Sequence, residues 1–365
     1  APSTLNEKVL RFDDERFVAT LDGLMQDGAF SKAVKHLLSD GIHDAIDPQV
    51  QAVLASLHPP SEPVDKLPEA APWPFDDSEQ GARDRLAMLR SIILDFPRGS
   101  AGGPSGLRPQ HLADILRAGC GAASSLLAAL DSLLRHALNG TLPKAACPYL
   151  ASASLIPLRK PEGGLAVRPV AVGETLRRIV SKFVAHSDLA SSLVASMAPQ
   201  QTGVATPGAC ETIAMALQSW CVAHQNRQDW IVLQVDLRNA FNCMDRRVIM
   251  KEIGELAPAL VPWAASCYAS HSMLYSQGHR FSSQTGVQQG DPLGPLLFAL
   301  GWQTVVRKLP DELAINLWYL DDGHLVGSPT QIAEALSIVA DQGTLLGIEV
   351  NPAKCKLWGP GTWPN

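Results

Sequence analysis

Two adjacent carboxylates, Asp321 and Asp322, lie in the segment Tyr319-Leu-Asp-Asp322. Short apolar runs precede and follow this segment, so the pattern predicts two strands joined by a tight turn with both carboxylates at its tip. Oxygen ligands in this arrangement could hold a divalent metal ion against a phosphate. Taken alone, such a pair before glycine is more often a plain solvated hairpin turn.

A third carboxylate, Asp236, ends the apolar run Ile231–Val235, which predicts a buried strand. An isolated aspartate in this position is more often a turn or helix-capping residue. Its functional interpretation is a metal ligand that lies beside the Asp321–Asp322 turn in one sheet. Nucleotidyl transfer needs carboxylates from separate strands, because two metal ions clamp the attacking and leaving oxygens.

The elements that must position these carboxylates follow from periodicity and turn signals. Strands are predicted at 153–158, 166–172, 231–235 and 348–350, and the first two are joined by the turn 159–164. Helices are predicted at 174–186, 209–224, 246–256 and 258–269. A further helix is predicted to run to 308, with Asp291 as its N-cap and Pro292 as its first helical residue. The last predicted helix, at 332–346, follows a Ser328–Gln331 capping box and ends before Gly347. The later part is a split βαβ pattern, an antiparallel sheet backed by helices.

The first part of the chain is predicted to be helical. Apolar residues recur at helical spacing within 5–57, and further helices are expected at 78–96 and 109–138, around a Gly/Pro/Ser loop at 99–106. A Pro- and acid-rich linker is expected at 58–77. The predicted organisation is a helical N-terminal region at 1–95, fingers and first palm elements at 96–230, a palm at 231–359, and a tail at 360–365.

Composition restricts the class of protein. The 365 residues are 46% hydrophobic and 18% charged, which is typical of a large globular core. No apolar run is long enough to span a bilayer and no signal peptide opens the chain, so an intracellular protein of nucleus or cytoplasm, without membrane contact, is expected. The seven scattered cysteines form no CxxC pair, which fits free thiols in a reducing compartment.

The net charge of −6 is unevenly distributed, because the acidic excess lies in the first hundred residues. That region should repel a phosphate backbone, so it is expected to pack on the protein or to bind a protein partner. A basic cluster lies between Leu155 and Lys182 and comprises Arg159, Lys160, Arg168, Arg177, Arg178 and Lys182. This cluster could bind phosphate, but a solvated helix face explains the last three residues about as well.

Three segments occur in an order and spacing that resemble the reverse transcriptase motifs: Val235-Asp-Leu-Arg-Asn-Ala-Phe-Asn242, Gly286-Val-Gln-Gln-Gly-Asp-Pro-Leu-Gly-Pro295 and Tyr319–Asp322. Upstream, Gly103–Leu107, within Gly103–Leu112, and Pro157–Pro169 resemble motifs of the non-LTR (LINE-type) retrotransposon family. The resemblance covers residues 96–359. It implies an α+β fold with right-hand polymerase fingers and palm, an antiparallel palm sheet backed by helices, and a helical N-terminal region.

The family's catalytic roles fall on matching positions. Asp236 and Asp321 resemble the two main metal-binding aspartates, Asp322 resembles the third acidic residue, and the backbone carbonyl of Leu237 adds a ligand. Lys354 matches a lysine that donates a proton to leaving pyrophosphate, with a solvated surface lysine as the alternative. The implied cofactor is two Mg²⁺ ions, with Mn²⁺ as a substitute.

The substrate-binding roles are assigned in the same way. Lys160 and Arg168 match the fingers cations that grip a triphosphate, since arginine suits a bidentate contact and lysine a point charge. Phe241 matches a steric gate that crowds a ribose 2′-OH, with an ordinary core phenylalanine as the alternative. Gln289 and Gly290 match the loop against the incoming nucleotide and template, where glycine permits close backbone approach.

The resemblance implies RNA-directed DNA polymerase activity, a nucleotidyl transfer from dNTPs to a DNA or RNA primer on an RNA template. Two alternatives stand beside it: a reverse-transcriptase-like scaffold that binds nucleic acid or protein without synthesis, and an RNA-dependent RNA polymerase. Phe241 counts against the RNA polymerase. The intact carboxylates and cations count against the scaffold, whereas the apparent absence of a helical thumb after Lys354 counts for it. No endonuclease, RNase H or zinc-knuckle segment is recognised.

Overall fold

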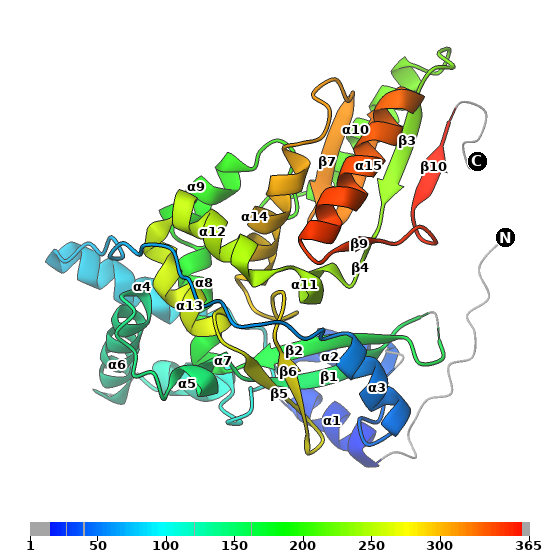
Figure 1. Cartoon of the computed structure of the whole chain (residues 1–365). Coiled ribbons are helices and arrows are strands. Elements are labelled where there is room, and N and C mark those ends of the chain that lie inside the picture. The colour runs from blue at the N-terminus through cyan, green and yellow to red at the C-terminus, as the bar shows by residue number, and fades with distance from the viewer. Residues whose placement is uncertain (1–14, 27, 39–40, 120, 162, 360–365) are drawn as a thin grey trace.

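The computed structural model describes residues 15–26, 28–38, 41–119, 121–161 and 163–359 (Figure 1). The helices are α1 (Glu15–Gln26), α2 (Phe30–Leu38), α3 (Pro48–Ser56), α4 (Glu79–Leu94), α5 (Pro109–Arg117), α6 (Gly121–Leu138), α7 (Cys147–Ala151), α8 (Thr175–Ala185), α9 (Asp188–Ser196), α10 (Ala209–Ala223), α11 (Ala240–Cys243), α12 (Arg246–Leu256), the 3-10 helix η1 (Pro258–Leu260), α13 (Val261–Tyr268), α14 (Gly294–Val306) and α15 (Pro329–Leu345). The strands are β1 (Ala153–Arg159), β2 (Val167–Gly173), β3 (Ile231–Val235), β4 (Leu237–Arg238), β5 (Ser272–Ser276), β6 (His279–Ser283), β7 (Ile315–Tyr319), β8 (Asp322–Gly327), β9 (Glu349–Val350) and β10 (Lys356–Trp358).

The palm sheet is antiparallel, in the order β10-β3-β8-β7. Its strands alternate between two apolar layers, as the period of two in a strand requires. Leu233 and Leu325 face the main core with α14 and α15, whereas Val232 and Val326 face α10. Both faces are therefore covered, and the carboxylates lie at one end of the strands.

The fingers sheet has the order β2-β1-β5-β6. β1 and β2 are antiparallel along their full length, and β5 joins β1 in parallel through Ala153 and Ser154. One face of this sheet shares a small core with α3, to which Val50 and Leu54 contribute. The N-terminal segment thus completes the fingers core, while the division at 95/96 stays a prediction.

Residues 58–77 contain neither helix nor strand, as expected of a linker, but they are firmly packed. Val64 and Trp73 are buried in the main core. The amide of Val64 donates to the carbonyl of Ala269 at 2.8 Å, and the amide of Ala71 donates to that of Pro258 at 3.1 Å. These two bonds hold the segment against η1 and α13. Figure 1 shows it running past α13.

The α+β class, the palm hairpin and the Ser328–Gln331 capping box are confirmed. The N-cap at Asp291 was wrong: α14 begins at Gly294 behind Leu293, and Asp291 is buried in an ion pair. The sequence also did not predict α9 or the β5–β6 hairpin. The part of the predicted first helix before residue 15 and the tail at 360–365 lie outside the described residues.

Candidate active site

The turn between β7 and β8 holds the paired carboxylates in a tight geometry. Tyr319 pairs with Asp322, so Leu320 and Asp321 form a two-residue turn. Leu320 has a φ of +60°, a left-handed conformation that is uncommon for a branched residue. Since surrounding bonds must hold such a conformation, it indicates a turn whose shape is fixed by the fold.

Hydrogen bonds with residues 200–202, in the segment before α10, fix this turn. The amide of Trp318 donates to the carbonyl of Gln200 at 2.7 Å, and that of Thr202 donates to the carbonyl of Trp318 at 2.8 Å. The side-chain amide of Gln201 donates to the carbonyl of Leu320 at 3.2 Å. Sequence reasoning missed Gln201, because nothing near it in the chain signals its partner.

Asp236 follows β3, whose last residue pairs with Gly323 directly beside the turn. Nδ2 of Asn351 donates to Oδ1 of Asp236 at 2.8 Å, and the amide of Asn351 donates to the carbonyl of Asp236 at 2.8 Å. The Sγ atom of Cys355 accepts from the amide of Asp236 at 3.4 Å. Asn351 and Cys355 therefore orient Asp236; both flank Lys354, and this adjacency was the only signal for them.

The carboxylates repel one another. Burial, together with the charges of Asp322 and Asp236, raises the pKa of Asp321 to about 6 against the opposing effects of a backbone hydrogen bond and of Arg168. Burial and Asp236 also raise the pKa of Asp322. This pattern is typical of acidic groups held together for a cation or a proton.

A cavity of about 410 Å³ gathers most of the predicted site residues. Its lining includes Lys160, Arg168, Asp236, Leu237, Phe241, Gln289, Asp321, Asp322 and Lys354. The remaining residue, Gly290, lines an adjoining cavity of about 520 Å³ together with Arg168, Phe241 and Gln289. Residues from five separated segments thus surround one space, with acids on the palm and cations on β1–β2; the functions of these residues stay predictions.

Gly290 lies against the fingers. Its φ is +135°, and an added Cβ would be 2.3 Å from the carbonyl oxygen of Ala171. The amide of Ala171 donates to the carbonyl of Gln289 at 2.8 Å. Only glycine fits this close approach of the loop to β2.

Phe241 combines both of its predicted interpretations. Its ring stacks on that of Phe298 with centroids 4.6 Å apart, so it is part of the core packing. It also lines both adjoining cavities. Support from Phe298 would hold the ring in place at the cavity wall.

The predicted basic cluster divides into two groups. Arg168 is exposed and Lys160 partly so, both beside the cavity. Arg177 and Arg178 are buried, with exposures of 1% and 9%, so neither a phosphate surface nor a solvated helix face describes them. Their partners are distant in sequence: Arg177 pairs with Asp291, and Arg178 donates to the carbonyl of Ala101.

The donor set fits hard cations such as Mg²⁺. Among the described residues, no three His, Cys, Asp or Glu side chains form a metal cluster by themselves. Mg²⁺ is usually bound by one or two carboxylates and completed by water and substrate phosphates. Asp236 and Asp321, with Asp322 and the Leu237 carbonyl on the same cavity wall, would supply the protein's share.

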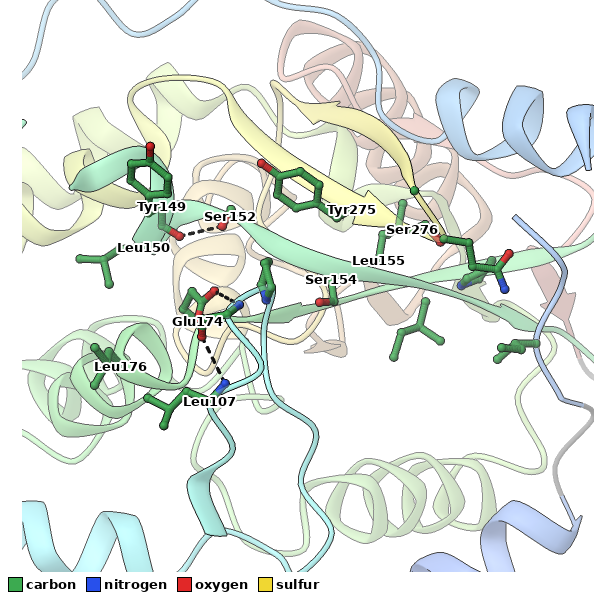
Figure 2. A pocket seen from close by; sticks show the side chains of 17 residues that line it. Leu107, Tyr149, Leu150, Ser152, Ser154, Leu155, Glu174, Leu176, Tyr275 and Ser276 are labelled. Atoms are coloured by element: carbon green, nitrogen blue, oxygen red, sulfur yellow. Dashed lines mark hydrogen bonds between the residues drawn. The ribbon is translucent and has the colours of Figure 1, made fainter. Parts of the chain in front are cut away.

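A larger cavity of about 1060 Å³ lies elsewhere and contains none of these carboxylates. Figure 2 shows Tyr149, Tyr275 and Leu176 around it, with Glu174 beside the Gly/Pro loop. Glu174 accepts from the amide and the hydroxyl of Ser105 at 2.8 and 2.6 Å, which fixes this loop against the start of α8.

The antiparallel palm sheet with acids at its hairpin, faced by a hairpin that bears cations, defines the class of right-hand polymerases. Residues 159–362 match the reverse transcriptase (RNA-dependent DNA polymerase) family. The chain belongs to this family, whose members are nucleotidyltransferases.

The chain is also similar to a retrotransposon protein and to a solved structure. The chain is 24% identical over 283 residues to the retrotransposable element SLACS 132 kDa protein of Trypanosoma brucei gambiense, a match that covers 75% of this chain and 23% of that protein. The chain thus spans about a quarter of that relative. The apo telomerase structure from Candida tropicalis, truncated from its C-terminal domain, matches 60% of this chain and 52% of that chain at 11% identity with a TM-score of 0.45. No described helix is both long and apolar enough to cross a membrane.

Proposed function

We propose that this chain carries the polymerase site of a retrotransposon reverse transcriptase and extends a DNA or RNA primer with dNTPs on an RNA template. The observation that carries the proposal is the convergence of Asp236, Asp321, Lys160 and Arg168 on one cavity. Acids on one wall and cations on the other suit a triphosphate with its metal ions.

The chain's residues divide the work. Asp236, Asp321, Asp322 and the Leu237 carbonyl hold the cations, and Lys160 and Arg168 orient the triphosphate. At this site two bound Mg²⁺ ions, or Mn²⁺ in their place, would supply Lewis-acid activation of the 3′-OH and charge neutralisation.

In the transfer itself, the primer 3′-OH loses its proton to water and its oxygen bonds to the α-phosphorus, while the bond from the α-phosphorus to the oxygen that bridges it to the β-phosphate breaks. Lys354 gives a proton to the leaving pyrophosphate. Gln289 and Gly290 form one wall of the space for the incoming nucleotide and its template base.

Primer extension on an RNA template with Mg²⁺ tests this proposal, with an Asp321→Asn/Asp322→Asn double variant as control. The expected result is dNTP incorporation by the natural sequence and none by the double variant. RNA binding without extension by the natural sequence would favour the non-synthesising scaffold. Extension with NTPs but not dNTPs would favour the RNA polymerase.

Phe241 is the residue to vary for sugar selection. We expect Phe241→Ala to raise ribonucleotide incorporation relative to dNTP incorporation by about ten- to a hundredfold, because the ring would no longer crowd the 2′-OH. Phe183→Ala serves as control, since Phe183 is a buried core phenylalanine that lines neither cavity of the candidate site. Unchanged sugar selection in Phe241→Ala would show that Phe241 is a core residue only.

A further inference from the structure

Arg177 of α8 contacts the loop that carries Gln289 and Gly290. Its side chain is only 1% exposed, and it does not line the carboxylate cavity. Its guanidinium donates from Nη1 to Oε1 of Gln288 at 2.7 Å and from Nη2 to Oδ2 of Asp291 at 2.6 Å. One side chain thus holds the residues immediately before and after Gln289 and Gly290.

Further bonds complete this cluster. Nη1 of Arg177 also donates to the carbonyl of Ala151 at 2.9 Å, and Gln288 donates to the same carbonyl at 2.9 Å. The hydroxyl of Tyr268 donates to Oδ2 of Asp291 at 2.6 Å. The loop is therefore fixed to α8, to the end of α7 and to α13, in addition to its contact with Ala171 of β2.

The charges explain why these groups stay together. Burial alone would raise the pKa of Asp291, but the charge of Arg177 and the bond from Tyr268 outweigh burial and hold that pKa low. A buried carboxylate left without its arginine would need to move toward water or another donor. Either change would displace the loop, because Asp291 directly follows Gly290.

A second ion pair, in which only the arginine is buried, provides the contrast. Arg85 of α4 donates to Asp131 of α6 at 2.5 Å, and the exposures of their side chains are 6% and 19%. This pair joins two helices and borders neither cavity of the candidate site. Loss of Arg85 should therefore weaken the fold without moving a nucleotide-binding group.

We propose that Arg177 is a positioning residue that sets where Gln289 and Gly290 lie against the incoming nucleotide, through its hydrogen bonds to Gln288 and Asp291. This inference rests on the proposed polymerase function. It makes α8 a support of the nucleotide site through a charge that never touches substrate.

The test compares steady-state dNTP incorporation by Arg177→Met, Arg177→Lys and Arg85→Met with the natural sequence, after thermal unfolding has located a temperature at which each is folded. Arg177→Met should raise KM for dNTP by about tenfold or more, and Arg177→Lys by less, because lysine keeps the charge but loses the fork. Arg85→Met should lower the unfolding temperature and leave KM within about twofold.

Each outcome is decisive. A wild-type KM in Arg177→Met or Arg177→Lys overturns the inference, as does an equal rise of KM in Arg85→Met. If Arg177→Met does not fold, Gln288→Met, which removes one arm of the grip and keeps the ion pair, must raise KM for dNTP or the inference fails. No extension by the natural sequence would instead contradict the proposed function.

Discussion

The two hairpins that face the cavity are held in opposite ways. The palm hairpin β7–β8 is enclosed: Trp318 has no exposed surface, its ring packs edge-on against that of Trp302 with centroids 5.5 Å apart, and hydrogen bonds with residues 200–202 fix its turn. The fingers hairpin β1–β2 is bonded along its strands, but an added Cβ at Gly163 or Gly164 would meet nothing within 4 Å. The palm carboxylates thus lie on a fixed turn, whereas the fingers hairpin ends in an open one.

The strongest test of this difference removes a palm carboxylate. Asp236→Asn should lower kcat by about a thousandfold or more, because a neutral amide can neither hold the cation as tightly nor balance its charge. Single-turnover extension measures the effect. The control is Asp229→Asn, an exposed aspartate near the start of the same strand that pairs with Arg227; a comparable loss there would contradict a specific role for Asp236.

A fingers cation should matter less and in a different kinetic constant. Arg168→Ala should raise KM for dNTP by about ten- to a hundredfold with a smaller change in kcat, since a phosphate contact is lost but the palm is intact. Arg159→Ala is the matched control, because that side chain is directed to the carbonyl of Ile42. Similar effects of the two variants would indicate a general charge effect.

The crowded palm should also be costly to fold. Asp321→Asn should stabilise the protein in EDTA by about 3 kcal/mol at pH 7.5, because folding raises the pKa of Asp321 from 3.8 to about 6. Because its pKa is raised in the folded state, Asp321 destabilises the fold fully above about pH 6. It has no effect at a pH so low that it is protonated in both the folded and the unfolded state. Urea unfolding should therefore show the gain at pH 7.5 and lose it below about pH 4; an equal gain at both would disprove the electrostatic cause.

The smallest effect is expected from the bonds that frame the palm turn. Gln201→Met should lower kcat by about two- to tenfold and leave KM for dNTP unchanged, since one neutral hydrogen bond to Leu320 is lost. Gln110→Met, which removes an amide bonded to Asp114 within α5, should have no effect. A rise of KM without a change in kcat would show that the fingers, not the palm, depend on Gln201.

The palm was predictable because its signals are local. The strand before Asp236, the capping box at Ser328 and the hairpin at Tyr319–Asp322 each depend on neighbours in sequence. The burial of Arg177 was not predictable, because its ion-pair partner Asp291 is 114 residues away in the sequence. From sequence, both residues matched commoner patterns, a helix-face arginine and an N-cap aspartate.

The β5–β6 hairpin shows a subtler limit. Its turn, Gln277-Gly278, has φ values of +46° and +86°, but glutamine is not among the residues that usually mark such turns. Its strands are rich in serine, and their inward side chains are buried by neighbours that the chain order does not reveal, since β5 lies beside β1. The hairpin was missed because the burial of its strands depends on tertiary contacts, which the local sequence does not show.

That parallel contact between β1 and β5 also dictates the order in which the chain can fold during synthesis. The fingers core draws on Ala45 and Leu54 at one extreme and on Leu274 and Phe281 at the other. It cannot close until the ribosome has released more than two hundred further residues, and contacts so distant in sequence form slowly. Until then α3 can pack only on β1 and β2, whose Leu155 and Val167 share its core, so the side of that core that β5 and β6 cover stays exposed on the nascent chain.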